Sequence, residues 1–119
     1  MVQQQKLEAY LNQFTGSEGS YPFGPEALVF KVKGKMFALV AEHQGVIKVT
    51  YKCQPADGEV LVSQFEGIIP GYHMNKRHWI TVSLSSDVNE AMLLDLADKS
   101  YQLVVSKLRK VEREELALL

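Results

Sequence analysis

The residues best suited to do chemistry lie in one short stretch, PGYHMNKRHW, at positions 70–79. The stretch combines two imidazoles, a carboxamide, two cationic side chains and two large aromatic rings. Proteins use such groups to hold phosphates and to stack on unpaired bases, and the imidazoles would gain charge at about pH 6. The candidate binding residues of the stretch are Tyr72, His73, Asn75, Lys76, Arg77, His78 and Trp79.

The same stretch gives little support to a metal site or to catalysis. His73 and His78 are five residues apart, which fits no common helical ligand pair, and no cysteine or carboxylate lies between them. The chain has no nucleophile elbow, phosphate-binding glycine loop or H-E-x-x-H motif. A lone cysteine such as Cys53 is more often a small apolar residue than a nucleophile. We therefore expect no metal site, no cofactor and no enzymatic activity.

Positive charge is concentrated in the middle of the chain. Residues 27–56 carry five lysines against Glu42 alone, which gives +4, although the formal net charge of the chain is −1. Four of these lysines alternate with apolar residues, as expected for a strand with one side in water. They are added to the candidate binding residues as Lys31, Lys33, Lys48 and Lys52.

The hydrophobic pattern predicts the elements that would position these side chains. Apolar residues at three- and four-residue spacing predict helices, and strict alternation predicts strands. The expected helices cover 2–14, 55 to about 65, and a long C-terminal segment capped by Ser86 or Asp87; the stretch VEREELALL either continues that helix or forms a separate turn. The expected strands cover 27–33, 36–42, 46–52 and 79–84, with a type II′ turn at Gly34-Lys35 between the first two. Residues 15–26 and 67–71 are expected to be loops.

This order predicts an α+β fold in which the N- and C-terminal helices pack on one face of an antiparallel sheet. The other face would then carry the lysines, Thr50 and Trp79, and an antiparallel sheet can leave such a face in water. Two interpretations remain open for Trp79. It is either an exposed ring that a partner covers, or a core anchor beside cations that merely solvate the preceding loop.

Size and composition bound the class of protein. At 119 residues with 46% apolar and 23% charged side chains, the chain is expected to form a single domain over 1–119. A single cysteine forms no internal disulfide, and no apolar run is long enough to span a membrane. We therefore expect a cytoplasmic protein without a membrane partner.

The runs GIIPGYHMNKRHWITVSL, YPFGPEALVFKVKGKMFALV and LADKSYQLVVSKL resemble the MmcQ/YjbR family of small bacterial proteins, and KCQPADGEVLV resembles its Cys-x-Pro segment. The resemblance implies a frataxin-like (CyaY-like) α+β fold, also likened to the double wing of the phage activator MotA. Members are usually labelled DNA-binding. Asn75 to Ile80 also resembles the Asn-Lys-x-x-Trp strand of frataxins, whose sheet face docks partner proteins. Frataxins bind iron through an acidic ridge on their first helix, whereas the first helix expected here holds one acid, Glu8, so the resemblance gives little support to iron delivery.

These observations predict a non-enzymatic protein that binds DNA with low sequence specificity through the lysines of the sheet face and the PGYHMNKRHW stretch. The alternative is a protein-interaction module that docks through the same face with Trp79 as its anchor. Loss of Lys76 and Arg77 would weaken the first kind of binding most, and Trp79→Ala the second. Rising salt would weaken phosphate binding steeply and a protein interface little.

Overall fold

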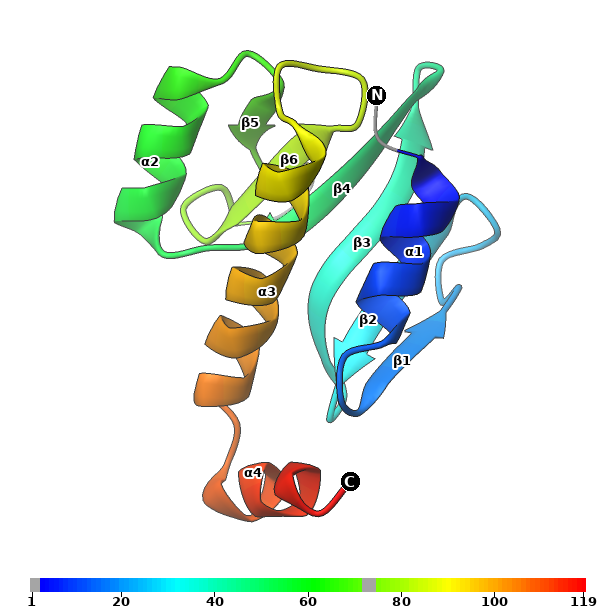
Figure 1. Cartoon of the computed structure of the whole chain (residues 1–119), viewed down its shortest axis with the longest axis vertical. Coiled ribbons are helices and arrows are strands. Elements are labelled where there is room, and N and C mark those ends of the chain that lie inside the picture. Colours follow the sequence, from blue (N-terminus) through cyan, green and yellow to red (C-terminus); the bar gives the residue numbers. More distant parts are fainter. Residues whose placement is uncertain (1–2, 72–74) are drawn as a thin grey trace.

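The structure is a computed structural model that describes residues 3–71 and 75–119. These residues form four helices and six strands (Figure 1). The helices are α1 (Gln4–Asn12), α2 (Pro55–Gln64), α3 (Glu90–Ser106) and α4 (Lys110–Ala117). The strands are β1 (Ser17–Ser20), β2 (Ala27–Val32), β3 (Lys35–His43), β4 (Val46–Lys52), β5 (Ile68–Pro70) and β6 (Trp79–Ser83).

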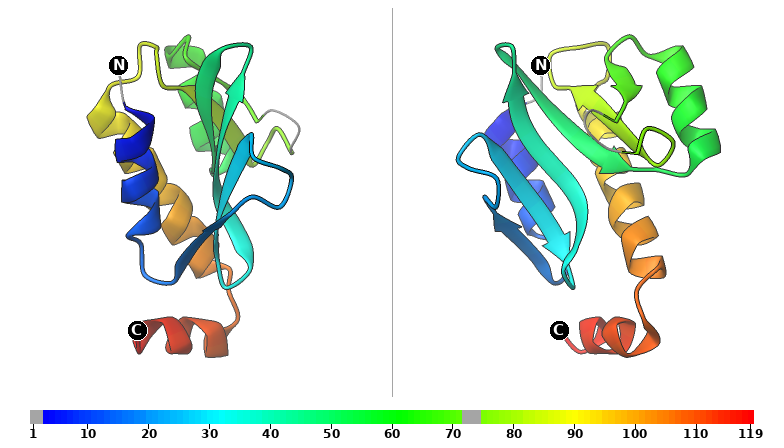
Figure 2. Two further views of the ribbon diagram at one scale, coloured as in Figure 1. Left: turned by 90° about the vertical axis from the view of Figure 1, so that its right-hand side faces the viewer. Right: turned by 180° about the vertical axis from the view of Figure 1, so that it is seen from behind.

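The strands form one sheet in the order β1-β2-β3-β4-β6-β5, with every neighbouring pair antiparallel. Helices α1 and α3 cover one face of this sheet, which Figure 2 shows edge-on in its left view. The predicted α+β fold, with the N- and C-terminal helices on one face, is therefore confirmed. None of the helices in the described ranges is long and apolar enough to cross a membrane.

The core lies between the sheet and helices α1 and α3. Alternate residues of the central strands point into it, and Val40, Val49 and Val82 are at most 2% exposed. The predicted stripe of α3 packs against them, because residues spaced by three and four fall on one side of a helix. The buried members of that stripe are Leu93, Leu96, Ala97, Ser100, Val104 and Leu108.

A β-bulge in β3 fits an additional aromatic ring into this core. Phe30 of β2 pairs with Ala38 and Lys31 pairs with Met36, so Phe37 is an extra residue without a partner on β2. Phe37 is fully buried. Its ring contacts those of Phe14, Phe30 and Tyr101, with centroids 5.7, 6.4 and 5.3 Å away. The bulge thus makes Phe37 the centre of an aromatic cluster.

The β2–β3 turn differs from the predicted turn by one residue. Lys33 and Gly34 occupy its centre with φ of 50° and 77°, as in a type I′ turn, whose twist matches that of the flanking strands. The prediction of a type II′ turn at Gly34-Lys35 is wrong, because it left Lys33 in the strand. Lys33 instead turns away, and its Nζ lies 3.6 Å from Glu115 Oε1 on α4.

Two short strands were predicted as loops. β1 has the sequence SEGS and β5 has only three residues, so neither shows an alternating apolar pattern. Both lie at the edges of the sheet, where backbone pairing with β2 and β6 holds them extended. Their strand structure depends on contacts that are distant in sequence.

Helix α3 begins later than predicted. Its N-cap is Asn89, whose Oδ1 accepts a hydrogen bond from Met92 N at 2.8 Å. The predicted cap, Asp87, instead accepts hydrogen bonds from the backbone N–H groups of Gly67 at 2.8 Å and Glu66 at 2.9 Å. These bonds hold the pKa of Asp87 below its ordinary value. Asp87 therefore ties the start of α3 to the segment that leads into β5.

The low pKa of Asp87 gives a pH-dependent prediction. A folded-state pKa below the unfolded value stabilises the protein above the unfolded pKa of about 3.9, and this contribution is lost as pH falls through the folded pKa. We expect Asp87→Asn to lower the urea midpoint at pH 7, and the gap from the native protein to shrink in strong acid. An equal gap at both pH values would contradict this role.

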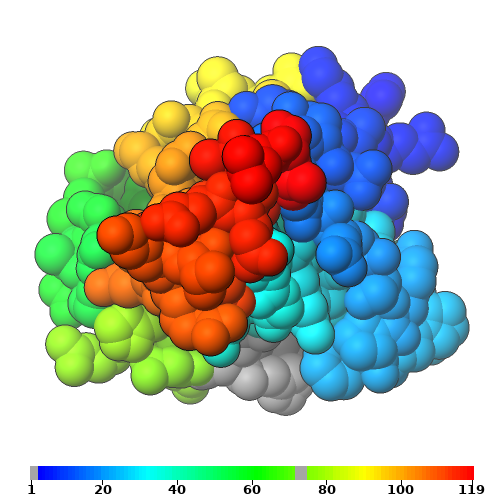
Figure 3. Space-filling view, turned by 90° about the horizontal axis from the view of Figure 1, so that it is seen from below, coloured from blue at the N-terminus to red at the C-terminus, as the bar shows by residue number. Residues whose placement is uncertain are grey.

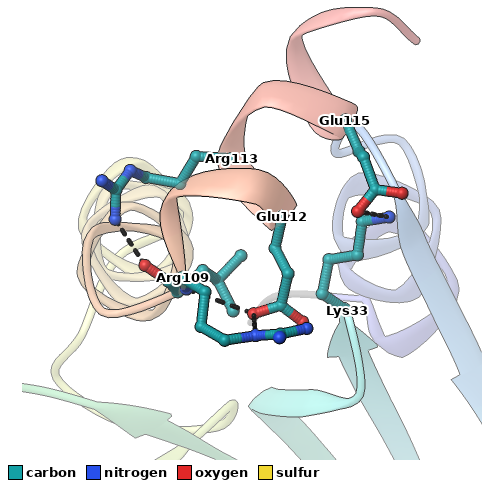
Figure 4. Close-up of polar contacts among 6 residues, drawn as sticks. Lys33, Arg109, Glu112, Arg113 and Glu115 are labelled. Atoms are coloured by element: carbon teal, nitrogen blue, oxygen red, sulfur yellow. Dashed lines mark hydrogen bonds and ion pairs between the residues drawn. The ribbon is translucent and has the colours of Figure 1, made fainter.

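Helix α4 is a separate helix, which settles the choice left open for VEREELALL. Glu112 Oε1 accepts hydrogen bonds from Arg109 N and Nε, at 3.1 and 3.3 Å, and the Arg113 guanidinium donates to the carbonyl of Leu108 (Figure 4). Leu116 packs on the other side of the helix, where a Cβ on Gly16 would come within 2.5 Å of its Cδ2. These contacts hold α4 against the end of α3 and beside the β2–β3 hairpin (Figure 3).

Candidate nucleic-acid interface

The sheet face opposite α1 and α3 carries three of the four predicted lysines. The register places Lys48 between Ala41 and Ser83, and Lys31 between Glu18 and Met36. Lys52 stands beside Trp79 at the end of β4. All three lysines are half-buried, as expected when the methylene stems lie along the sheet and the ammonium groups reach water. We call Lys31, Lys48, Lys52 and Trp79 the basic face.

Positive charge predominates on the basic face. Within residues 3–71 and 75–119, none of its three lysines forms an ion pair, whereas Lys6 and Lys99 on the helices pair with Glu90 and Asp95. Glu18 is the acid directly opposite Lys31 in the register. The centre of the face is formed by two uncharged residues, Thr50 and Thr81. Their hydroxyl groups form a hydrogen bond, with 2.9 Å between the oxygens. The ammonium groups are thus available to an anionic partner.

Trp79 lies on this face and is half-buried. The Nζ of Lys52 is 5.8 Å from the centroid of its ring, within the range of a cation–π contact. The backbone N–H of Gly71 donates to Trp79 O at 2.7 Å, and a Cβ on Gly71 would come within 2.5 Å of Trp79 Cβ. Trp79 is therefore held in place from β5, on the face away from the core, and is not a core anchor.

Four residues of the PGYHMNKRHW stretch, Asn75 to His78, lie directly before β6. Asn75 forms a turn, in which its Oδ1 accepts from Arg77 N at 3.0 Å and its carbonyl accepts from His78 N at 3.1 Å. Lys76 and Arg77 are exposed at this turn and line a cavity of about 280 Å³ against α2. The carbonyl of His78 continues the ladder by accepting from Cys53 N at 2.8 Å.

The structure therefore divides the predicted site. It brings Lys31, Lys48, Lys52 and Trp79 together on the basic face and places Lys76 and Arg77 beside α2. Lys33 is the exception among the predicted lysines, because the turn directs it to Glu115 on α4. Tyr72 and His73 lie outside the described residues.

One part of the interface was not predicted. Strands β3 and β4 separate beyond the Ala38–Tyr51 pair, and the view from behind shows the lower half of α3 uncovered by strands (Figure 2, right). A groove of about 360 Å³ lies at this point, and we call it the β3–β4 groove. Its lining residues are Lys35, Met36, Lys52, Trp79, Val104, Lys107 and Leu108. No sequence signal links the lysine of α3 to the lysines of the sheet.

Ser100 of α3 bridges the two strands where they separate. Its fully buried hydroxyl donates to Phe37 O at 2.6 Å and accepts from Lys52 N at 2.9 Å. It thereby satisfies one backbone group on each strand that the ladder leaves unpaired.

We predict that Ser100→Ala lowers the free energy of unfolding by about 1–3 kcal/mol, because a buried carbonyl and N–H lose their partner. Urea unfolding measures this change, with Ser106→Ala as the control. The Ser106 hydroxyl is exposed and donates to Leu103 O within its own helix. Equal effects of the two substitutions would contradict the bridging role.

Among the described residues, Cys53 and the other metal-binding residue types do not gather into a cluster. Cys53 is buried, and burial raises the pKa of its thiol, which disfavours the reactive thiolate at neutral pH. Across the described residues, no three histidine, cysteine, aspartate or glutamate side chains come together as metal ligands.

The sequence is similar to known bacterial proteins over most of its length. A family model described as YjbR matches residues 12–103. The chain is 34% identical over 114 residues to YjbR of Escherichia coli K12, which covers 96% of this chain and 97% of that protein. It is 43% identical over 94 residues to YbdF of Escherichia coli O157:H7, with coverage of 79% and 77%.

Solved structures have the same fold. The crystal structure of a Deinococcus radiodurans protein with a DUF419 domain matches with a TM-score of 0.88 and 38% identity, over 95% of this chain and 86% of that chain. A Pseudomonas syringae protein matches with a TM-score of 0.76 and 28% identity, over 86% and 98%. The chain is therefore a member of the YjbR family.

Proposed function

We propose that this protein binds nucleic acid through the basic face, with low sequence specificity. The observation that carries the proposal is the position of Lys31, Lys48 and Lys52 on one open sheet face, without ion pairs among the described residues and beside Trp79. Phosphates supply most of the affinity of non-specific complexes, and lysine binds them as a point charge.

Low specificity follows from the kind of groups on the face. Sequence is read mainly by side chains that contact base edges in pairs of hydrogen bonds, as arginine, asparagine and glutamine do. The basic face presents lysine ammonium groups and one aromatic ring. Such groups position a backbone and stack on any base, so they carry little sequence information.

A protein partner is the second candidate, favoured by apolar side chains on the same face. Ile69 is 39% exposed and lies in the same row of the sheet as Thr81, Thr50 and the half-buried Leu39. Together with Trp79, these side chains resemble the aromatic and aliphatic centre of a protein interface.

Salt dependence separates the two candidates. We expect labelled DNA to bind at low salt, measured by fluorescence anisotropy. The five lysines of the basic face and the β3–β4 groove would give a log–log salt slope of roughly −3 to −5. No binding at high micromolar protein in low salt would overturn the proposal. The apolar side chains would then favour a protein partner, whose binding would change little with salt.

A further inference from the structure

We propose that the β3–β4 groove holds one unstacked base of a single-stranded nucleic acid against Trp79, with the adjoining phosphates on Lys35, Lys52 and Lys107. This inference rests on the proposed function and deepens it: it names single strands as the preferred ligand and the groove as the site that selects them. The groove is lined by residues of β3, β4 and α3, by Lys107 and Leu108 directly after α3, and by the first residue of β6.

The groove has the size and the walls of a small-ligand site. Its volume of about 360 Å³ lies at the lower end of the range of roughly 300–1,000 Å³ that such sites span. Val104 of α3 and Leu108, two residues beyond the end of α3, provide an apolar floor, and Trp79 lines the groove as well. A planar, largely apolar group would bury its faces in this groove.

The charges at the groove select for anions. Lys35 of β3, Lys52 of β4 and Lys107 at the C-cap of α3 all line it, whereas no aspartate or glutamate does. Within the described ranges, none of the three forms an ion pair, although Lys110 pairs with Glu114 one helix further on. A flat ring surrounded by ammonium groups matches a base that carries phosphates on both sides.

Trp79 and Lys52 form a contact that such a ligand would replace. The ammonium of Lys52 now lies 5.8 Å from the ring centroid. A base that stacks on the ring would take that position, and Lys52 would turn to the phosphate of the same nucleotide. The ring face that Lys52 contacts in the free protein is thus the face that the base would take.

The polymer is favoured over a free nucleotide because the groove opens onto the basic face. Lys52 belongs to both, and the open side continues from it to Lys48 along β4. A strand with its base in the groove can lay further phosphates along this line. In a duplex the bases are paired and stacked inside the helix, so none is free to enter.

The groove is formed before a ligand arrives. Ser100 holds β3 and β4 at their separation. Arg113 donates to the carbonyl of Leu108, and the ion pair between Lys33 and Glu115 joins α4 to the β2–β3 turn (Figure 4). These contacts fix the end of α3 that supplies the floor, so that binding requires little ordering of the protein.

The test uses the fluorescence of Trp79, the chain's only tryptophan. The full chain is titrated with four probes: a thymine oligonucleotide, the duplex of that strand with an adenine oligonucleotide, an abasic oligonucleotide of equal length, and thymidine monophosphate. We expect quenching by the single strand at an affinity roughly 5- to 100-fold above that for the abasic strand. The duplex should bind more weakly and leave the emission almost unchanged.

Two variants locate the effect in the groove. Trp79→Leu should lose the roughly 5- to 100-fold preference for the base-containing strand and still bind the abasic strand, as measured by anisotropy. Phe23→Leu, at a 74% exposed ring outside the groove, is the control. Lys107→Ala should weaken binding of the single strand and reduce its salt slope by roughly 0.7, whereas Lys110→Ala should not.

The outcomes separate this inference from the proposed function. Equal binding of the thymine and abasic strands without quenching would overturn the groove as a base site and leave phosphate binding by the basic face intact. Binding of thymidine monophosphate as tight as that of the oligonucleotide would overturn the choice of a polymer. No binding of any oligonucleotide would overturn both proposals.

Discussion

Reversing the charge of the basic face is expected to abolish most DNA binding. We expect Lys31→Glu/Lys48→Glu/Lys52→Glu to lower the affinity at about 50 mM salt by roughly 100- to 1,000-fold, because each lost phosphate contact removes the release of a counterion. Anisotropy with the labelled oligonucleotide measures the loss. The salt slope should become shallower by roughly 2 to 3.

A matched variant controls for total charge. Lys6, Lys99 and Lys110 lie on helices, away from the basic face, and each pairs with an acid. Their reversal to glutamate changes the net charge by the same amount as the triple reversal on the basic face. Exposed ion pairs contribute about 0–1 kcal/mol each, and circular dichroism verifies that both variants fold. Equal losses in the two triple variants would show that only total charge matters and would contradict an interface on the basic face.

A second pair of substitutions decides how far the interface extends. Lys76 and Arg77 are exposed at the start of β6 and face the cavity beside α2. If the DNA follows the basic face alone, Lys76→Glu/Arg77→Glu should have a smaller effect than the triple reversal. A larger effect would place the principal contact at the turn before β6, in agreement with the expectation from the sequence that Lys76 and Arg77 matter most.

The regular elements could be predicted because their signals are local. Strand β4 begins and ends where the alternation predicted, at Val46 and Lys52, and the buried stripe of α3 follows its three- and four-residue spacing. In both elements, neighbouring residues already define the buried side. The same local signal predicted the short helix that begins at Pro55.

The errors arose where one residue decides the geometry or where the partner is distant in sequence. A turn displaced by one position moved Lys33 from the sheet face to α4, and the bulge placed Phe37 in the core beside Ala38. Edge strand β1 has no apolar residue to reveal it. The β3–β4 groove joins Lys35, Lys52 and Lys107 only in the folded chain, so a charge count along the sequence does not find it.

The largest loss of stability is expected from Phe37→Ala. Phe37 is fully buried, and its ring contacts three others. Truncation leaves a cavity that these aromatic rings fill only in part, and such changes cost about 3–5 kcal/mol. Urea unfolding monitored by circular dichroism measures the loss. The control is Phe23→Ala, because Phe23 is 74% exposed and should change stability by less than about 0.5 kcal/mol.

The same substitution also tests how the bulge supports the site. The side chain of Phe37 anchors the bulge in the core, while its carbonyl accepts from Ser100 and the preceding residue, Met36, lines the groove. A folded Phe37→Ala protein should therefore show altered Trp79 emission as well as reduced stability, because β3 loses its anchor at the groove. A loss of less than about 1 kcal/mol would contradict the central position of Phe37 in the core. A stability loss of about 3–5 kcal/mol with unchanged Trp79 emission would show instead that the hydroxyl of Ser100 and the packing of α3 hold the groove without the aromatic cluster.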